Sequence, residues 1–168
     1  MKKLVIVFLL SVAIFLAFGP KAQAQIAKEG SFSNVVSWSG TMKTLPMGQE
    51  RLHMSYEVLG AVIGDTGDDL FHNSSMHCLG GFDAVKGEYN NDSGFCTYTR
   101  PDGDQFFMTN KVAGKLGSPG KGVMTFVGGT GKLAGIQGSC EFTRTTVRSS
   151  APGTIQGYNR AKWQYKLP

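Results

Sequence analysis

The sequence predicts an all-β protein, a single closed barrel of eight antiparallel strands behind an N-terminal signal peptide. Three observations support this fold class. No stretch has a sustained helical periodicity, eight strand-like runs follow one another between Gly, Pro, Asn and Asp residues, and several runs alternate apolar and polar positions. The 144 residues after position 24 allow roughly 18 residues per strand and turn, which suits a small barrel. A β-sandwich stays open as the alternative, because the number of strands does not separate the two folds.

The first 24 residues have the three-part layout of a secretory signal peptide. The basic head Met1–Lys3 is followed by the apolar run Leu4–Phe18, the helix breaker Gly19-Pro20 and the cleavage pattern Ala22-Gln23-Ala24. A membrane anchor is disfavoured, because spanning needs roughly 20 apolar residues. We therefore predict a signal peptide over residues 1–24 and a barrel domain over residues 25–168. The protein is expected to be exported, periplasmic or secreted, with no membrane anchor after cleavage.

The net charge of +5 comes largely from the signal peptide. Lys2, Lys3 and Lys21 are three of the 17 Lys and Arg residues, whereas all 12 acidic residues lie beyond position 24, so cleavage leaves a net charge of +2. The remaining basic residues are scattered singly along the chain. Because nucleic-acid binding needs a clustered basic face, we expect no nucleic-acid partner.

The predicted strands are bounded by turn residues and follow one another without a second domain. In chain order they lie near Phe32–Leu45, Arg51–Ile63, Phe71–Gly80, Glu88–Arg100, Gln105–Ala113, Gly122–Val127, Gly135–Val147 and Thr154–Leu167. Pro101-Asp102-Gly103-Asp104 predicts the turn before the fifth strand, since Pro sets φ and Gly accepts a positive φ. Lys115–Gly122 is a loop, and Pro152-Gly153 marks the turn before the eighth strand. In that last run an apolar face from Ile155 to Leu167 lies opposite a basic and polar face.

The second run shows a clear alternation of faces. Its apolar face holds Leu52, Met54, Tyr56 and Val58, and its polar face holds His53, Ser55 and Glu57. We expect the larger apolar face to point into the barrel. His53 and Glu57 lie roughly 13 Å apart along a strand. They become an acid–base pair only if their face lines the lumen and a cross-strand group joins them.

The third and fourth runs carry two of the three cysteines. Cys78 and Cys96 are symmetric about Gly87, so a hairpin centred there places them opposite each other. An oxidising compartment allows a disulfide, and we predict the bridge Cys78–Cys96 with Cys140 left over. Three buried reduced thiols stay open as the alternative.

The glycine-rich segment Val127–Lys132 lacks the pattern of a phosphate cradle. A P-loop needs Gly where Phe126 stands and Ser or Thr where Leu133 stands. We interpret the segment as a tight turn or bulge between the sixth and seventh strands.

The longer segment Phe126–Phe142, FVGGTGKLAGIQGSCEF, resembles the strand–turn–strand signature of the allene oxide cyclase and dirigent barrels. In those families a Gly-Gly-Thr/Ser-Gly turn precedes an apolar residue, a small residue and a Gly inside the next strand, here Leu133, Ala134 and Gly138. The whole chain also resembles small secreted bacterial proteins of uncharacterised function. The resemblance implies an eight-stranded, calycin-like barrel of a kind that handles apolar or aromatic small molecules. It assigns no catalytic residue to this chain.

The sequence predicts neither a metal site nor a cofactor. His72, His77 and Cys78 lie near one another, but a zinc site needs three or four converging ligands. Asp65, Asp68 and Asp69 lie in a loop without the pattern of a calcium-binding EF-hand, and a solvated turn explains them.

The expected function is to bind a small apolar or aromatic molecule in the lumen. The ligand-binding candidates are the aromatic residues Tyr56, Tyr98, Phe107 and Trp163. One alternative is a cofactor-free isomerase, cyclase or lyase, for which His53, Glu57 and His77 are the catalytic candidates. Another is a structural or interaction module of the cell envelope. The oligomeric state is left open.

Overall fold

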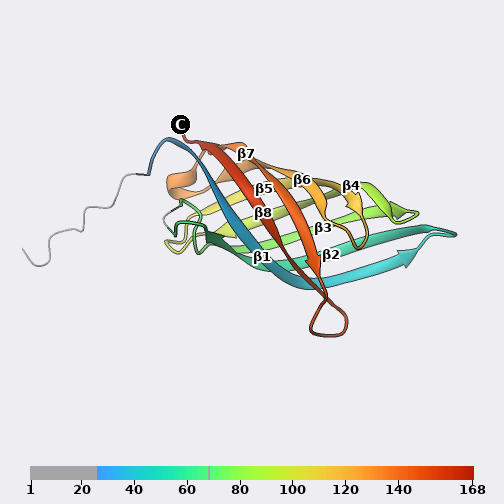
Figure 1. The fold of residues 1–168 in the computed structure, drawn as a ribbon. Coiled ribbons are helices and arrows are strands. Elements are labelled where there is room, and N and C mark those ends of the chain that lie inside the picture. The colour runs from blue at the N-terminus through green and yellow to red at the C-terminus, as the bar shows by residue number, and fades with distance from the viewer. Residues whose placement is uncertain (1–25, 68) are drawn as a thin grey trace, which may run out of the picture.

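The chain forms one closed barrel of eight strands, in which each strand is antiparallel to the next and β8 pairs with β1 (Figure 1). The computed structural model describes residues 26–67 and 69–168. The strands are β1 (Glu29–Pro46), β2 (Arg51–Gly64), β3 (Ser75–Val85), β4 (Glu88–Thr99), β5 (Gln105–Lys115), β6 (Gly120–Gly129), β7 (Gln137–Val147) and β8 (Thr154–Lys166). Closure decides between the two predicted architectures, and the barrel is confirmed. The predicted signal peptide lies outside the described residues.

The predicted strands agree with the observed ones, with a notable exception in the third. β3 begins at Ser75 and not at Phe71, because residues 69–74 still belong to the connection from β2. The side chain of Phe71 is fully buried although it lies in a loop. Its ring centroid lies 4.2 Å from that of Phe106 and 5.1 Å from that of Trp163. An apolar residue near a strand thus serves here as a plug for the barrel.

The two ends of the barrel differ. The first, which we call the plugged end, holds the β2–β3, β4–β5 and β6–β7 connections and the C-terminus. Phe71, Leu133 and Ile136 from two of these connections are buried and close it. The second, which we call the hairpin end, holds the β1–β2, β3–β4, β5–β6 and β7–β8 turns, and the β1–β2 hairpin extends beyond the rest of the barrel (Figure 1). No helix in the described parts of the chain is long and apolar enough to cross a membrane.

The β3–β4 hairpin has the predicted centre. Lys86 and Gly87 form its turn with φ values of 52° and 79°, the positive values that a two-residue hairpin of the primed type requires. The register places Cys78 opposite Cys96, and the two form a disulfide with a Cα–Cα distance of 4.1 Å. The predicted bridge is therefore confirmed, and Cys140 is a buried free thiol.

The glycine-rich segment forms a turn, as predicted. β6 ends at Gly129 and a single 3-10 turn follows over Gly131–Leu133. Gly131 has a φ of 53°, and a Cβ there would collide with the Oδ1 atom of Asp104. The backbone N–H of Lys132 donates to the other carboxylate oxygen of Asp104 at 2.9 Å. Glycine is needed because this turn packs closely against the β4–β5 connection.

Candidate ligand site

The inward face of β2 is the predicted apolar one. Met54 and Val58 are buried, whereas His53 and Glu57 are exposed on the outer wall. The outer wall brings histidines and carboxylates together: His77 Nε2 lies 2.8 Å from Glu57 Oε1, and His53 Nδ1 lies 2.8 Å from Asp83 Oδ1. These pairs are half-exposed to solvent. An acid–base pair inside the lumen is therefore not made by His53, Glu57 or His77.

The predicted aromatic candidates have three different surroundings. Tyr98 and Trp163 are buried in the core, where the Tyr98 hydroxyl donates to Met124 Sδ at 3.3 Å and Trp163 Nε1 donates to Asn34 Oδ1 at 2.8 Å. Phe107 is a correction, because the alternation of β5 turns it to the outer wall and Phe106 inward. Tyr56 borders a cavity. Tyr56 is thus the candidate that meets open space in the lumen.

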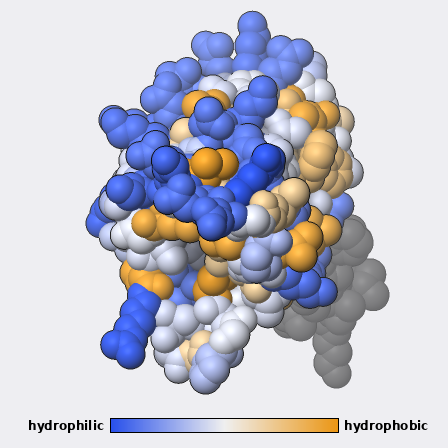
Figure 2. Space-filling model, turned by 90° about the vertical axis from the view of Figure 1, so that its right-hand side faces the viewer, coloured by the Kyte–Doolittle hydropathy of each residue, from blue (hydrophilic) through white to orange (hydrophobic). Residues whose placement is uncertain are grey.

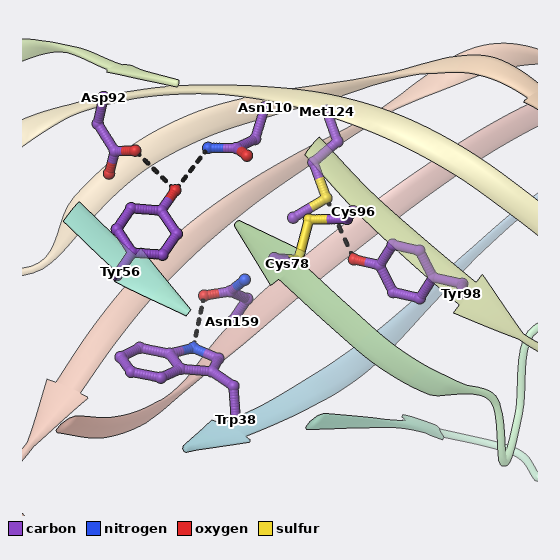
Figure 3. Close-up of a disulfide and its surroundings, with 9 residues drawn as sticks. All are labelled: Trp38, Tyr56, Cys78, Asp92, Cys96, Tyr98, Asn110, Met124 and Asn159. Atoms are coloured by element: carbon purple, nitrogen blue, oxygen red, sulfur yellow. Dashed lines mark hydrogen bonds between the residues drawn. A yellow bond between two sulfur atoms is a disulfide. The ribbon is translucent and has the colours of Figure 1, made fainter. Parts of the chain in front are cut away.

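A cavity of about 40 Å³ lies in the lumen between the core and the hairpin end. Its wall is formed by Trp38, Tyr56, Val58, Met76, Cys78, Cys96, Asn110, Met124, Arg144, Ile155 and Asn159. The disulfide and the two methionines supply an apolar, sulfur-rich side, and the amides, the phenol and the guanidinium supply a polar side. Figure 3 shows the disulfide and Met124 together with the two amides and the phenol. The volume holds about three or four water molecules at about 10–15 Å³ each. The buried side chains of the main core lie on the other side of the cavity, toward the plugged end.

A buried ion pair crosses the lumen beside this cavity. Arg144 Nη1 on β7 lies 2.5 Å from Asp92 Oδ2 on β4, and the Asp92 side chain is fully buried. The Tyr56 hydroxyl donates to Asp92 Oδ1 at 2.9 Å, and Asn110 Nδ2 donates to the Tyr56 oxygen at 3.3 Å. Figure 3 shows the Tyr56 hydroxyl between Asp92 and Asn110. The Arg144 guanidinium carbon also lies 5.8 Å from the centroid of the Tyr56 ring.

The surroundings hold these groups in defined protonation states. Burial, followed by the charge of Asp92, raises the pKa of Tyr56 to about 12, so this phenol is neutral at physiological pH. Burial acts to lower the pKa of Arg144, but the neighbouring Asp92 outweighs it and the pKa is raised. The site therefore combines a charged pair, a neutral hydroxyl and an amide.

Apolar clusters lie on both sides of the ion pair. The main core fills the barrel from the plugged end, and a smaller cluster of Met54, Phe82 and Ala84 lies toward the hairpin end. Tyr56 and Tyr89 pack against both. Figure 2 views the hairpin end, where apolar residues gather in separate places among hydrophilic ones. The charged pair is consequently enclosed by apolar material, which strengthens its electrostatic interactions.

Asp92, Asn110 and Arg144 were not among the sequence-based candidates. A signal for them exists in the alternation of their strands. By the alternation of their strands, Asp92 lies on the same face as Cys96 and Tyr98, and Asn110 lies on the same face as Phe106. Arg144 likewise lies on the same face as Phe142. A polar residue that continues an apolar face is a candidate for the lumen. In the described parts of the chain no three His, Cys, Asp or Glu side chains converge as a metal site.

No protein-family model matches this chain, and neither does any curated protein. Among solved structures, a pterocarpan synthase dirigent protein is similar in fold. It has 10% sequence identity and a TM-score of 0.46, and the similarity covers 90% of this chain and 99% of that one. Dirigent proteins are one of the two families that the segment Phe126–Phe142 resembles. The similarity concerns the architecture and assigns no role to any residue.

Proposed function

We propose that this protein is an exported barrel that binds one small molecule in its lumen from the hairpin end. The ligand has an apolar or aromatic body and at least one polar group. The body lies against Val58, Met76, Met124 and the disulfide, and the polar group meets the cluster around Arg144. Export is supported by the disulfide between Cys78 and Cys96, since such bonds persist in oxidising compartments.

The buried pair of Asp92 and Arg144 carries this proposal. Replacing a buried ion pair by well-packed apolar residues is often neutral or stabilising, so such a pair is weak evidence for a stabilising role. Ligand sites, by contrast, are mostly apolar with a few convergent polar groups. Asn110 supports the same interpretation, because its buried Oδ1 atom has no hydrogen-bond partner among the described residues. An unpartnered buried acceptor costs about 1–3 kcal/mol, and a ligand donor would remove that cost.

The cavity must enlarge to admit a ligand. Its volume of about 40 Å³ is well below the roughly 300–1,000 Å³ of ordinary ligand pockets. Methionine side chains are flexible and adapt to irregular shapes, and Met54, Met76 and Met124 lie on or near the route from the hairpin end. We therefore expect these side chains to move when the ligand enters.

Native mass spectrometry of the protein purified from the cells that produce it tests the proposal. The expected result is a bound small molecule that survives in the parent protein and in Arg148→Met, whose changed residue is exposed in the β7–β8 loop. The double variant Asp92→Asn/Arg144→Met should lose this mass while remaining folded. Trp38 borders the cavity, so adding the released molecule back should change the fluorescence of Trp38 in the parent. A parent protein without any bound mass, and with no such response to candidate ligands, would overturn the proposal.

A second candidate function is that of an interaction module. It is favoured by the outer wall of β3 and β4, where Leu79 and Phe95 lie opposite each other and are 54% and 70% exposed. Sedimentation of the parent protein and of Phe95→Ser tests it. A module that uses this wall shows self-association or partner binding that the substitution removes, and a monomer unaffected by the substitution contradicts it.

A further inference from the structure

Four basic side chains gather on the outer wall of β5, β6 and β8, away from the lumen. We call Lys111, Lys121, Arg160 and Lys162 the basic wall. One register row runs from Lys111 through Val123 and Glu141 to Lys162. The next runs from Lys121 through Thr143 to Arg160. All four basic residues are exposed, so strand pairing places together residues that are far apart in the sequence.

The basic wall is not neutralised by the protein itself. Among the described residues, no carboxylate lies within 4.0 Å of any of its four cations, although Glu141 shares one row with two of them. Within these two rows four cations and one carboxylate give a net charge of +3, and Asp65, which borders the same depression, lowers it to +2.

Some cations elsewhere on the surface do have partners. Arg51 is paired with Asp83, Lys86 with Glu50, and Lys132 with Asp102. Lys43, Lys115 and Arg148 are also exposed without an ion pair among the described residues, but the register does not place them together. The basic wall differs because four unpaired cations share two neighbouring rows, which leaves its charge available to a partner.

The spacing of the cations suits a chain with separated anionic groups. Neighbouring strands lie about 4.8 Å apart, so Lys111 and Lys162, three strands apart, are about 14 Å apart at the backbone, and Lys121 and Arg160 about 10 Å. The same side chains border a shallow, open depression that crosses β5 to β8 and also contains the hydroxyl groups of Ser33 and Thr143. A linear molecule can lie along such a depression.

We propose that the basic wall binds an acidic polysaccharide. Sulfate, phosphate or carboxylate groups of the chain would meet the four cations, and its sugar hydroxyls would meet Ser33, Thr143 and the carboxylate of Glu141. A continuous phosphate backbone fits less well, because Glu141 lies between the cations. Single-stranded nucleic acids also need exposed aromatic rings for stacking. The aromatic residue beside Arg160 is Tyr158, and its ring already has the Arg160 guanidinium 5.9 Å from its centroid. This ring therefore offers a poor stacking surface to a base. The proposal does not rest on the lumen site.

Heparin is the probe, with a single-stranded DNA of similar charge and vesicles containing phosphatidylglycerol as comparison ligands. Isothermal titration at several salt concentrations measures the affinity of the purified protein for each. With the coefficient of about −0.7 per contact for single-stranded chains, four ionic contacts give a slope of about −2.8 when the logarithm of the affinity is plotted against the logarithm of the salt concentration. This slope corresponds to a loss of about 50-fold in affinity from about 50 to about 200 mM salt. Lys121→Gln/Lys162→Gln should reduce the slope to about −1.4, whereas the control Lys43→Gln/Lys86→Gln removes the same charge elsewhere and should leave it unchanged. Thermal unfolding confirms that both variants fold.

The proposal is supported if heparin binds more tightly than the DNA and the vesicles, and only the first double variant weakens it. Absence of heparin binding at low salt would overturn it. Equal weakening by both variants would assign the effect to net charge and overturn the site. Tighter binding of the DNA or of the vesicles would overturn the choice of partner. None of these outcomes depends on whether a ligand occupies the lumen.

Discussion

The buried pair of Asp92 and Arg144 leads to a prediction that separates stability from function. We expect Arg144→Met to destabilise the protein strongly and Asp92→Asn/Arg144→Met to restore most of the loss. The single variant leaves a carboxylate whose side chain is fully buried and which retains only the hydrogen bond from Tyr56 among its described side-chain partners. The double variant removes both charges, and the amide oxygen that replaces the carboxylate still accepts that hydrogen bond.

The magnitude follows from the burial of the pair. Breaking a buried ion pair by removing one partner costs about 3–5 kcal/mol, whereas replacing both partners is often neutral or stabilising. For a domain of this size each 1 kcal/mol corresponds to roughly 2–4 °C in Tm, so the single variant should melt about 6–20 °C lower.

Urea denaturation followed by circular dichroism gives the free energy of unfolding of the parent and both variants. If Arg144→Met lowers the free energy of unfolding by less than about 1 kcal/mol, water or another donor has taken the place of Arg144 beside Asp92. A double variant as unstable as the single one would show that the pair stabilises the fold, and the functional interpretation of the pair would then be refuted.

Three further predictions concern the disulfide, the phenol and the plug. Replacing Cys78 and Cys96 by Ala should lower the free energy of unfolding by about 3 kcal/mol in the chain-entropy treatment of a link across 18 residues, as measured in urea; an unchanged value would contradict that treatment. The pKa of Tyr56 is raised to about 12 from about 10 in the unfolded chain, so its neutral phenol contributes to the free energy of unfolding. This contribution is complete below pH 10 and declines by about 3 kcal/mol toward pH 12. Tyr56→Phe should remove this decline and one late step from the tyrosinate absorbance titration, and a titration identical to that of the parent would refute the assignment. Phe71→Ala should cost about 3–5 kcal/mol and Phe95→Ala, at a side chain 70% exposed, less than about 0.5 kcal/mol; equal losses would refute the plug.

Much of the fold was predictable because its signals are local. The period of two along β2 and β8 separates inward from outward side chains within a single strand. Turn residues such as Gly87 and Gly103 adopt the positive φ values that their turns require. The disulfide was predictable for the same reason, since a symmetric hairpin needs only its centre to place Cys78 opposite Cys96.

The candidate site was predicted only in part, because it depends on which strands face each other across the lumen. Tyr56 was found from the alternation of β2. Asp92 and Arg144 lie 52 residues apart on β4 and β7, which are not neighbours in the sheet, so no pairing rule joins them. Phe107 was misplaced because two consecutive phenylalanines do not show which one faces inward, and the register of β5 with its neighbours makes that choice.

The sequence by itself predicted the number of strands, most of their turns, the inward face of β2 and the Cys78–Cys96 bridge, since each depends on residues within one strand or one hairpin. Closure of the sheet decided the rest. It placed Phe71 in one end of the barrel, joined Asp92 to Arg144 across the lumen, and brought singly scattered basic residues into one wall. The physical reason is that these contacts connect strands distant in the sequence, and only the complete ring of hydrogen bonds fixes their relative positions.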